Sequence, residues 1–127
     1  MFEFHSGGPR YFSPYGEWVI LLDVDGGLEI SHYVGDQTTD YGRALLTEAE
    51  AAPLWTAVRA LDLPHLESST RMAVPDEGAY TFVLREGAHN YVAHIWRGDA
   101  LKDHRIAALV AAIRAAITRA TGTQAVL

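Results

Sequence analysis

The sequence predicts an α+β domain built from one pattern that occurs twice: two strand-like runs followed by an amphipathic helix. The first copy spans residues 16–62, and the second spans residues 79–121. A short additional strand over residues 2–5 precedes both copies, so the order is ββαββα with an extra N-terminal strand. Because short turns join antiparallel strands, we expect a mostly antiparallel sheet of four or five strands with both helices packed on one face.

The whole chain is expected to form a single domain over residues 1–127. Its length is typical of one domain, and 49% of its residues are hydrophobic, which is enough for one sizeable core. Glycine commonly ends helices, so Gly122 should close the last helix. We therefore expect an ordered core over residues 1–122 and a frayed tail over residues 123–127.

The strands of the first copy are marked by composition and by a turn signal. Residues 17–24 are rich in β-branched and aromatic side chains, which favour strands. Asp25 and Gly26 form a strong hairpin signal before a second strand over residues 28–34. Residues 35–46 are polar, with Asp, Thr and Gly, and we expect them to form a loop.

The helix of the first copy has a clear start signal and an internal proline. Thr47 and Glu50 have capping-box spacing, in which two side chains satisfy two backbone N–H groups at the helix start. Pro53 lies beyond the first helical position, so we expect a kink there or a start a few residues later. The connection over residues 64–78 has no periodicity, and connections of this length are often functional.

In the second copy, a hairpin pairs residues 80–85 with residues 91–97. A long helix follows, capped by Asp99 or Asp103. Apolar residues recur along this helix at helical spacing, so one side of it should face the core. The residues of this stripe are Ile106, Leu109, Val110, Ile113 and Ile117.

Composition excludes several classes of function. The chain has no cysteine, which removes thiol catalysis and cysteine zinc sites and fits a reducing compartment. Its net charge of −6 divides into −9 for residues 1–78 and +3 for residues 79–127. Nucleic-acid binding needs clustered Lys and Arg, so we expect no nucleic-acid partner. No run approaches the roughly 18 apolar residues of a membrane span, and we expect a soluble, cytoplasmic protein without membrane contact.

The histidines are the candidates for metal binding or acid–base chemistry. They are scattered, and no His-Glu-x-x-His occurs, so we expect no metal and no cofactor. His32 and His94 lie in the second strand of each copy and would be neighbours if those strands were adjacent. They define one alternative function, a small-molecule or hydrolytic pocket between sheet and helices. Their other interpretation is a pair of half-buried sheet histidines.

Residues 10–15 bring three aromatic rings and an arginine into a proline-containing segment. Tyr, Phe and Arg are enriched at protein–protein contacts, because rigid rings add buried area at little entropic cost. Arg10, Tyr11, Phe12 and Tyr15 are therefore predicted to bind another protein. The alternative is a loop that folds over an open end of the core.

The run Phe-Glu-Phe-His-Ser-Gly-Gly over residues 2–8 is a short strand that enters a Ser-Gly-Gly turn. Together with the helix opened at residues 47–50, the strand over residues 80–84 and a C-terminal helix, it resembles the emfourin family of small bacterial proteins. Members are associated with inhibition of thermolysin-like zinc proteases, so the resemblance implies a cytoplasmic protein inhibitor without catalysis of its own. The hairpin over residues 18–34 and the 64–78 connection depart from the family pattern.

These observations favour a small protein-binding module that is not an enzyme and that acts by steric occlusion of a partner. We expect contact through residues 10–15, residues 64–78 or both. The partner is another protein, and the resemblance implies a metalloprotease. Two alternatives stay open: the pocket of His32 and His94, and a structural homo-oligomer, such as a homodimer, formed by pairing of exposed strand edges.

Overall fold

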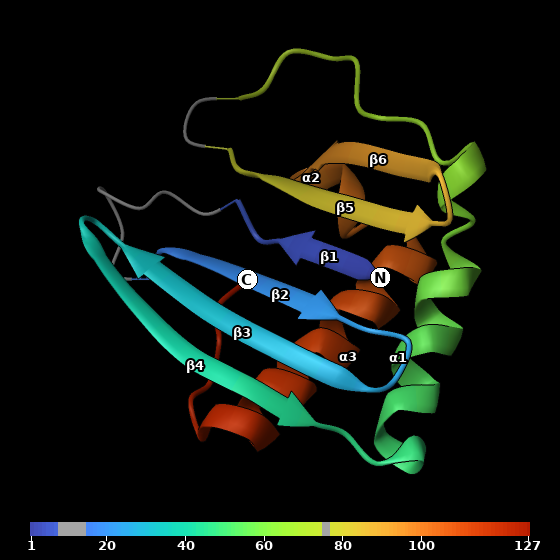
Figure 1. Ribbon diagram of the computed structural model, residues 1–127. Coiled ribbons are helices and arrows are strands. Elements are labelled where there is room, and N and C mark those ends of the chain that lie inside the picture. Colours follow the sequence, from blue (N-terminus) through green and yellow to red (C-terminus); the bar gives the residue numbers. More distant parts are fainter. Residues whose placement is uncertain (8–14, 75–76) are drawn as a thin grey trace.

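Figure 1 shows the computed structural model of the chain, which describes residues 1–7, 15–74 and 77–127. Within these residues, six strands form one fully antiparallel sheet in the order β4-β3-β2-β1-β5-β6. The predicted α+β class is confirmed. The strands are β1 (Phe2–His5), β2 (Glu17–Leu22), β3 (Gly27–Val34), β4 (Gln37–Leu45), β5 (Ala79–Glu86) and β6 (His89–Trp96). The helices are α1 (Glu48–Ala60), the 3-10 turn η1 (Leu63–His65), the short α2 (Arg97–Ala100) and α3 (His104–Thr121).

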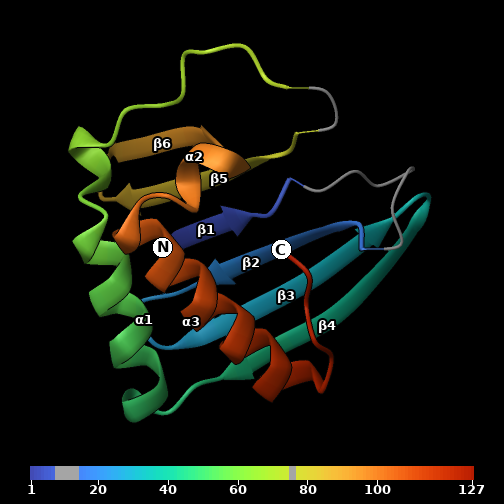
Figure 2. The same ribbon diagram turned by 180° about the vertical axis from the view of Figure 1, so that it is seen from behind.

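Both long helices lie on the same face of the sheet, as predicted. Helix α3 runs behind the strands in Figure 1 and in front of them in Figure 2, and α1 packs against α3 near the ends of the strands, at the right of Figure 1. Buried and less buried side chains alternate along the strands, as expected when helices cover one face only. In β1, Phe2 and Phe4 are buried towards the helices, whereas Glu3 and His5 point to the other side. We call the side away from α1 and α3 the open face.

The predicted helix stripe is buried in the core, but the C-terminal tail differs from expectation. Ala125 and Leu127 are only 4% and 3% exposed, so the tail is part of the core and is not frayed. Figure 2 shows the tail leaving the end of α3 and running back along the helix-covered side of the sheet. Burial of two apolar side chains offsets the entropy of ordering this segment.

Strand β4 occupies the segment that we expected to be a loop. It lacks alternation of apolar and polar residues because it is an edge strand, exposed along almost its whole length. Its pairing with β3 forms it, and the pairing contains a β-bulge: Glu29 lies opposite Arg43 and Ser31 opposite Asp40, which leaves two β4 residues facing Ile30. A glycine within the bulge has a φ of 75°, in the left-handed region.

The edge of β6 is covered by the chain that follows η1. The Ser69 N–H donates to the carbonyl oxygen of His94 (2.9 Å), and the His94 N–H donates to Ser68 Oγ (3.0 Å). The Trp96 N–H donates to Ser69 Oγ (3.1 Å). These bonds satisfy backbone groups that an uncovered edge strand would offer to another strand.

Local start and stop signals are confirmed with two refinements. The capping box of Thr47 and Glu50 is present, and α1 begins at Glu48 and continues through Pro53. Helix α3 is capped by Asp103, not by Asp99, and Gly122 ends it with a φ of 73°. No helix in the described ranges combines the length and apolarity needed to cross a bilayer.

Replacing Ile113 by Asp should unfold the domain, because the carboxylate would have no partner in the core. We expect a loss of about 4 kcal/mol or more in the free energy of unfolding. Thermal denaturation followed by circular dichroism measures it, with Ala115→Asp on the exposed side of α3 as control. A wild-type melting curve for Ile113→Asp would show that the α3 face is wrongly assigned.

Replacing Leu127 by Ala should lower the free energy of unfolding by about 2 kcal/mol, since a buried side chain is truncated. Val126→Ala is the matched control, because Val126 is exposed and its truncation should change stability by less than about 0.5 kcal/mol. Urea denaturation of both variants gives the comparison. Equal stabilities would mean that the tail is not docked in solution.

Candidate functional site

The connection between η1 and β5 projects from the β6 side of the sheet (Figure 1). We call residues 66–78 the Arg71 loop; the described part is 66–74 and 77–78. At its tip Met72 is 91% exposed and Val74 is 57% exposed, and Met72 is the most exposed large hydrophobic residue in the described part of the chain. Large apolar side chains that are exposed close together are typical of contact surfaces.

Arg71 clamps the base of this loop to two other elements. Its Nε donates to both carboxylate oxygens of Asp99 in α2 (3.2 and 3.1 Å). Its Nη1 and Nη2 donate to the two carboxylate oxygens of Glu77 (2.8 Å each). The planar guanidinium therefore engages two carboxylates at once, which fixes its orientation in a way that a lysine could not.

Further hydrogen bonds hold the backbone on both sides of the tip. The Trp96 indole N–H donates to the carbonyl oxygen of Arg71 (2.9 Å), and Arg71 Nη1 donates to that of Met72 (3.0 Å). The Val74 N–H donates to Glu77 Oε1 (3.3 Å). The backbone is thus held immediately before and after the exposed methionine.

Electrostatics keep the clamp closed at neutral pH. The hydrogen bond from Arg71 lowers the pKa of the Glu77 carboxyl, against a smaller opposing effect of desolvation. The same bond raises the pKa of the Arg71 guanidinium. Because the pKa of Glu77 is lowered in the folded state, its ion pair with Arg71 stabilises the fold fully above the ordinary glutamate pKa of 4.5. This stabilisation is lost as the pH falls through the lower pKa of the folded state.

The Ser-Gly turn of the family resemblance lies at the base of the Arg71 loop. Ser6 is buried, and its Oγ accepts from the Trp18 N–H (2.8 Å). Gly7 has a φ of 63°, and a Cβ built there would lie 1.8 Å from the carbonyl oxygen of Ala79. A Cβ on Gly78 would in turn meet the Gly7 carbonyl oxygen at 2.9 Å. The end of β1 and the end of the Arg71 loop therefore touch through their backbones.

Of the four residues predicted to bind another protein, only Tyr15 lies within the described part of the chain. Arg10, Tyr11 and Phe12 lie outside the described residues, so their role stays a prediction. Tyr15 is 56% exposed, and its carbonyl oxygen lies 2.6 Å from His32 Nε2.

His32 and His94 do not form a common pocket, so this part of the alternative function is wrong. His32 is on the helix-covered face, where its ring stacks on Trp18 with a centroid distance of 4.0 Å. His94 is on the open face, with Nδ1 at 2.9 Å from Thr81 Oγ1. Strands β2, β1 and β5 separate them, which amounts to roughly 19 Å in strand spacing.

A row of charged side chains crosses the open face from β5 to β2. Arg85 Nη1 donates to Glu3 Oε2 (2.9 Å), and Glu3 Oε1 lies 2.5 Å from His5 Nε2. His5 Nδ1 is 3.3 Å from Glu17 Oε1. Burial by itself raises the pKa of Glu3, but the hydrogen bonds from His5 and Arg85 outweigh it and the pKa is lowered. The row links three strands and keeps this face polar.

The described ranges contain no group of three or more His, Cys, Asp or Glu side chains that could hold a metal ion. Two serines of the Arg71 loop, Ser68 and Ser69, have structural roles. The Ser69 hydroxyl donates to Asp99 (3.1 Å), and Ser68 accepts from the backbone of β6.

Sequence reasoning identified the 64–78 connection but missed Arg71 as its organiser. The available signal was the one arginine of this connection, which lies between Glu67 and Glu77 in the sequence. The second carboxylate, Asp99, is 28 residues away and could not be assigned without the fold.

No known protein family matches the chain, and no characterised protein has a similar sequence. The emfourin resemblance therefore stays a prediction, and the functional argument depends on the geometry described above.

Replacing Arg71 by Ala should release the loop without unfolding the domain, because the clamp is at the surface and the core does not include it. We expect backbone amides of residues 67–74 to exchange about tenfold faster with solvent, while α3 amides are unchanged. Hydrogen exchange followed by mass spectrometry measures this. Arg114→Ala, on the exposed side of α3, is the control. Unchanged exchange in Arg71→Ala would contradict the clamp.

Proposed function

We propose that this protein is a small protein-binding module that presents the Arg71 loop to another protein. The observation that carries the proposal is the combination of an exposed apolar tip, Met72 and Val74, with a backbone held by Arg71. A backbone segment that is already held before binding loses little conformational entropy on binding, so more of its contact energy appears as affinity.

The mechanism is steric occlusion. The apolar tip enters a cleft of the partner, and the rigid base prevents the loop from adapting to it. Such a mechanism needs no titrating group, no metal and no cofactor. The backbone contact between Gly7 and Gly78 places the end of β1 beside the end of the Arg71 loop. Residues 10–15 follow Gly7 closely in the sequence, which supports a binding surface that combines them with the Arg71 loop.

The finer proposal is that the partner is a thermolysin-like zinc protease and that the protein acts as its cytoplasmic inhibitor. Its support is the resemblance of residues 2–8, the opening of α1 and strand β5 to the emfourin family. Ser6 and Gly7, which carry part of this resemblance, hold the end of β1 against β2 and the start of β5.

The alternative of a homo-oligomer built by edge pairing has less support. One outer strand, β6, is covered by residues 68 and 69, and the other, β4, carries a bulge at Gly42. Both features are ways in which proteins discourage pairing between sheet edges.

A Met72→Asp/Val74→Asp variant should lose binding, because two carboxylates would be desolvated in the contact. Against a thermolysin-like protease and a fluorogenic peptide, we expect the inhibition constant to rise at least about 30-fold, typical of a lost hot spot. Val24→Asp is the control, since Val24 is equally apolar and exposed but lies in the β2–β3 turn. Equal inhibition by the double variant would contradict the role of the loop.

Cross-linking separates binding from inhibition. A photoreactive amino acid at position 72 should give a protein adduct in the source cells, and the same group at position 24 should not. Absence of inhibition with an adduct at position 72 removes the protease partner and keeps the binding module. Absence of an adduct at position 72 overturns the proposed function.

A further inference from the structure

A depression of about 270 Å³ lies between α1 and the neighbouring ends of the strands. Three parts of the chain contribute apolar side chains to its lining: the β2–β3 turn, helix α1 and strand β5. These side chains are Val24, Val58 and Leu84. Small-molecule pockets are mostly apolar with a few polar groups and range upward from about 300 Å³. This depression is near that lower limit, so it suits a ligand about as small as a single amino acid.

Trp55 brings to this depression a hydrogen-bond donor that has no acceptor. Its side chain lines the depression, and its indole Nε1 is buried without a hydrogen-bond partner among the described residues. The indole N–H of Trp96, by contrast, donates to a backbone carbonyl oxygen. Buried donors in proteins are nearly always paired, with the protein, with water or with a ligand. The Trp55 N–H therefore indicates a place for an acceptor from outside the chain.

A guanidinium without a carboxylate partner lies beside this donor. Arg59 also lines the depression, and its Cζ is 5.8 Å from the centre of the Trp55 ring. In the described part of the chain, no carboxylate oxygen lies within ion-pair distance of Arg59. The guanidinium of the second arginine at the depression, Arg85, is already bound to Glu3 on the open face. Arg59 and the Trp55 N–H are thus two donors suited to one carboxylate.

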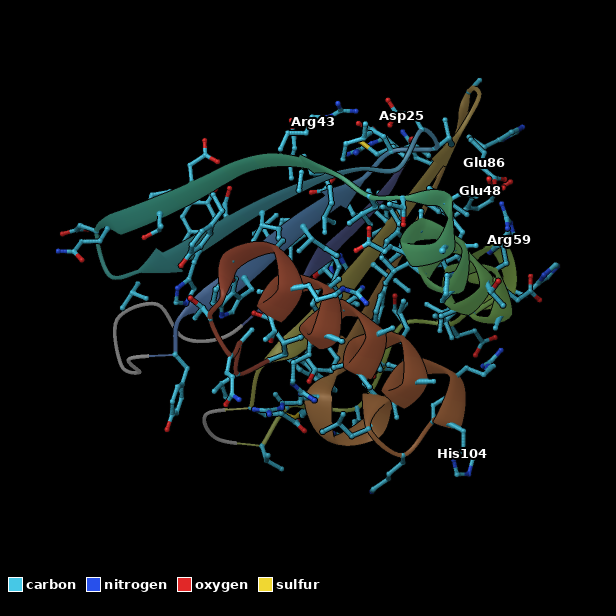
Figure 3. The ribbon with its side chains drawn as sticks, turned by 90° about the horizontal axis from the view of Figure 1, so that it is seen from below. Asp25, Arg43, Glu48, Arg59, Glu86 and His104 are labelled. Atoms are coloured by element: carbon cyan, nitrogen blue, oxygen red, sulfur yellow. The ribbon has the colours of Figure 1, made fainter. Side chains whose placement is uncertain are left out.

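The same depression has a carboxylate without a cation. Glu86 follows the buried Leu84 by two positions in β5, so its side chain leaves the strand on the side of α1. Among the described residues, no cationic nitrogen is within ion-pair distance of Glu86, and the Met1 α-amino group donates instead to the carbonyl oxygen of Arg85 (2.9 Å). Figure 3 shows Glu86 and Arg59 on the same side of the molecule. Opposite charges therefore line one apolar depression without neutralising each other.

We propose that this depression binds a free α-amino acid with an apolar side chain. The ligand carboxylate accepts from Arg59 and from the Trp55 N–H, and the ligand ammonium pairs with Glu86. The ligand side chain packs against Val58 and Leu84. A free amino acid carries both charges on one carbon, which neither a simple carboxylic acid nor an internal peptide segment does, so its charges match both sides of the depression.

The test is a nuclear magnetic resonance titration of the full chain with L-leucine as probe. We expect the Trp55 indole N–H resonance, assigned by its loss in Trp55→Phe, to shift with a dissociation constant of about 1 mM. Amide shifts should be confined to the neighbourhood of residues 24, 55–59 and 84–87. Leucine amide lacks the carboxylate and N-acetyl-leucine lacks the ammonium, so each should bind at least about tenfold more weakly. Absence of shifts at about 10 mM leucine, or equal binding of either derivative, overturns the inference.

Two variants assign the charges. Arg59→Gln should weaken leucine binding at least about tenfold. Glu86→Gln should weaken leucine binding to a similar extent but leave N-acetyl-leucine binding unchanged, because that ligand has no ammonium. Arg114→Gln and Glu67→Gln are the matched controls, since they remove exposed charges away from the depression and should bind leucine like the wild type. Unchanged leucine binding in Arg59→Gln or in Glu86→Gln contradicts the proposed site.

This site and the Arg71 loop are tested independently. The loop ends where β5 begins, and the depression lies where β5 ends. The variant Met72→Asp/Val74→Asp should therefore bind leucine as the wild type does. A titration without shifts overturns the amino-acid site and leaves the Arg71 loop proposal standing, whereas the cross-linking result does not bear on the amino-acid site.

Discussion

The sheet of this protein is covered by helices on one face only, and this constraint organises the rest of the molecule. Each strand must place its large apolar side chains on the covered face, and the central strand β1 shows the result most clearly: Phe4 is completely buried between Ile20 and Phe82 of the neighbouring strands. The tail adds Leu127 to the same layer. A single shared core follows, and among the described residues no second layer buries the opposite side of the sheet.

The open face is where charge and contact chemistry remain available. Its centre is kept polar by the row that includes Glu3 and His5, so that an uncovered sheet does not become an aggregation surface. Its two sides differ: Glu29, Asp40 and Arg43 line a depression near β4, and the Arg71 loop projects beyond β6 on the other side.

The backbone contact of Gly7 with Gly78 and Ala79 joins parts of the chain that are far apart in sequence. It explains why a Ser-Gly turn after the first strand matters to a loop that begins near residue 66. Any side chain at position 7 would collide with the Ala79 carbonyl and separate β1 from the base of the loop. The sheet and the candidate binding surface therefore depend on the same close approach.

The sequence by itself determined the α+β class, the hairpins, the capping box of α1 and the buried stripe of α3, because each is set by periodicity or caps within about one turn or one hairpin. Only the tertiary structure decided that β4 is a strand, since an exposed edge strand depends on pairing with β3 and carries no periodic signal of its own. The same holds for the separation of His32 from His94 and for the clamp of Arg71 on Asp99. These depend on strand order and on contacts between distant residues, which local sequence patterns do not encode.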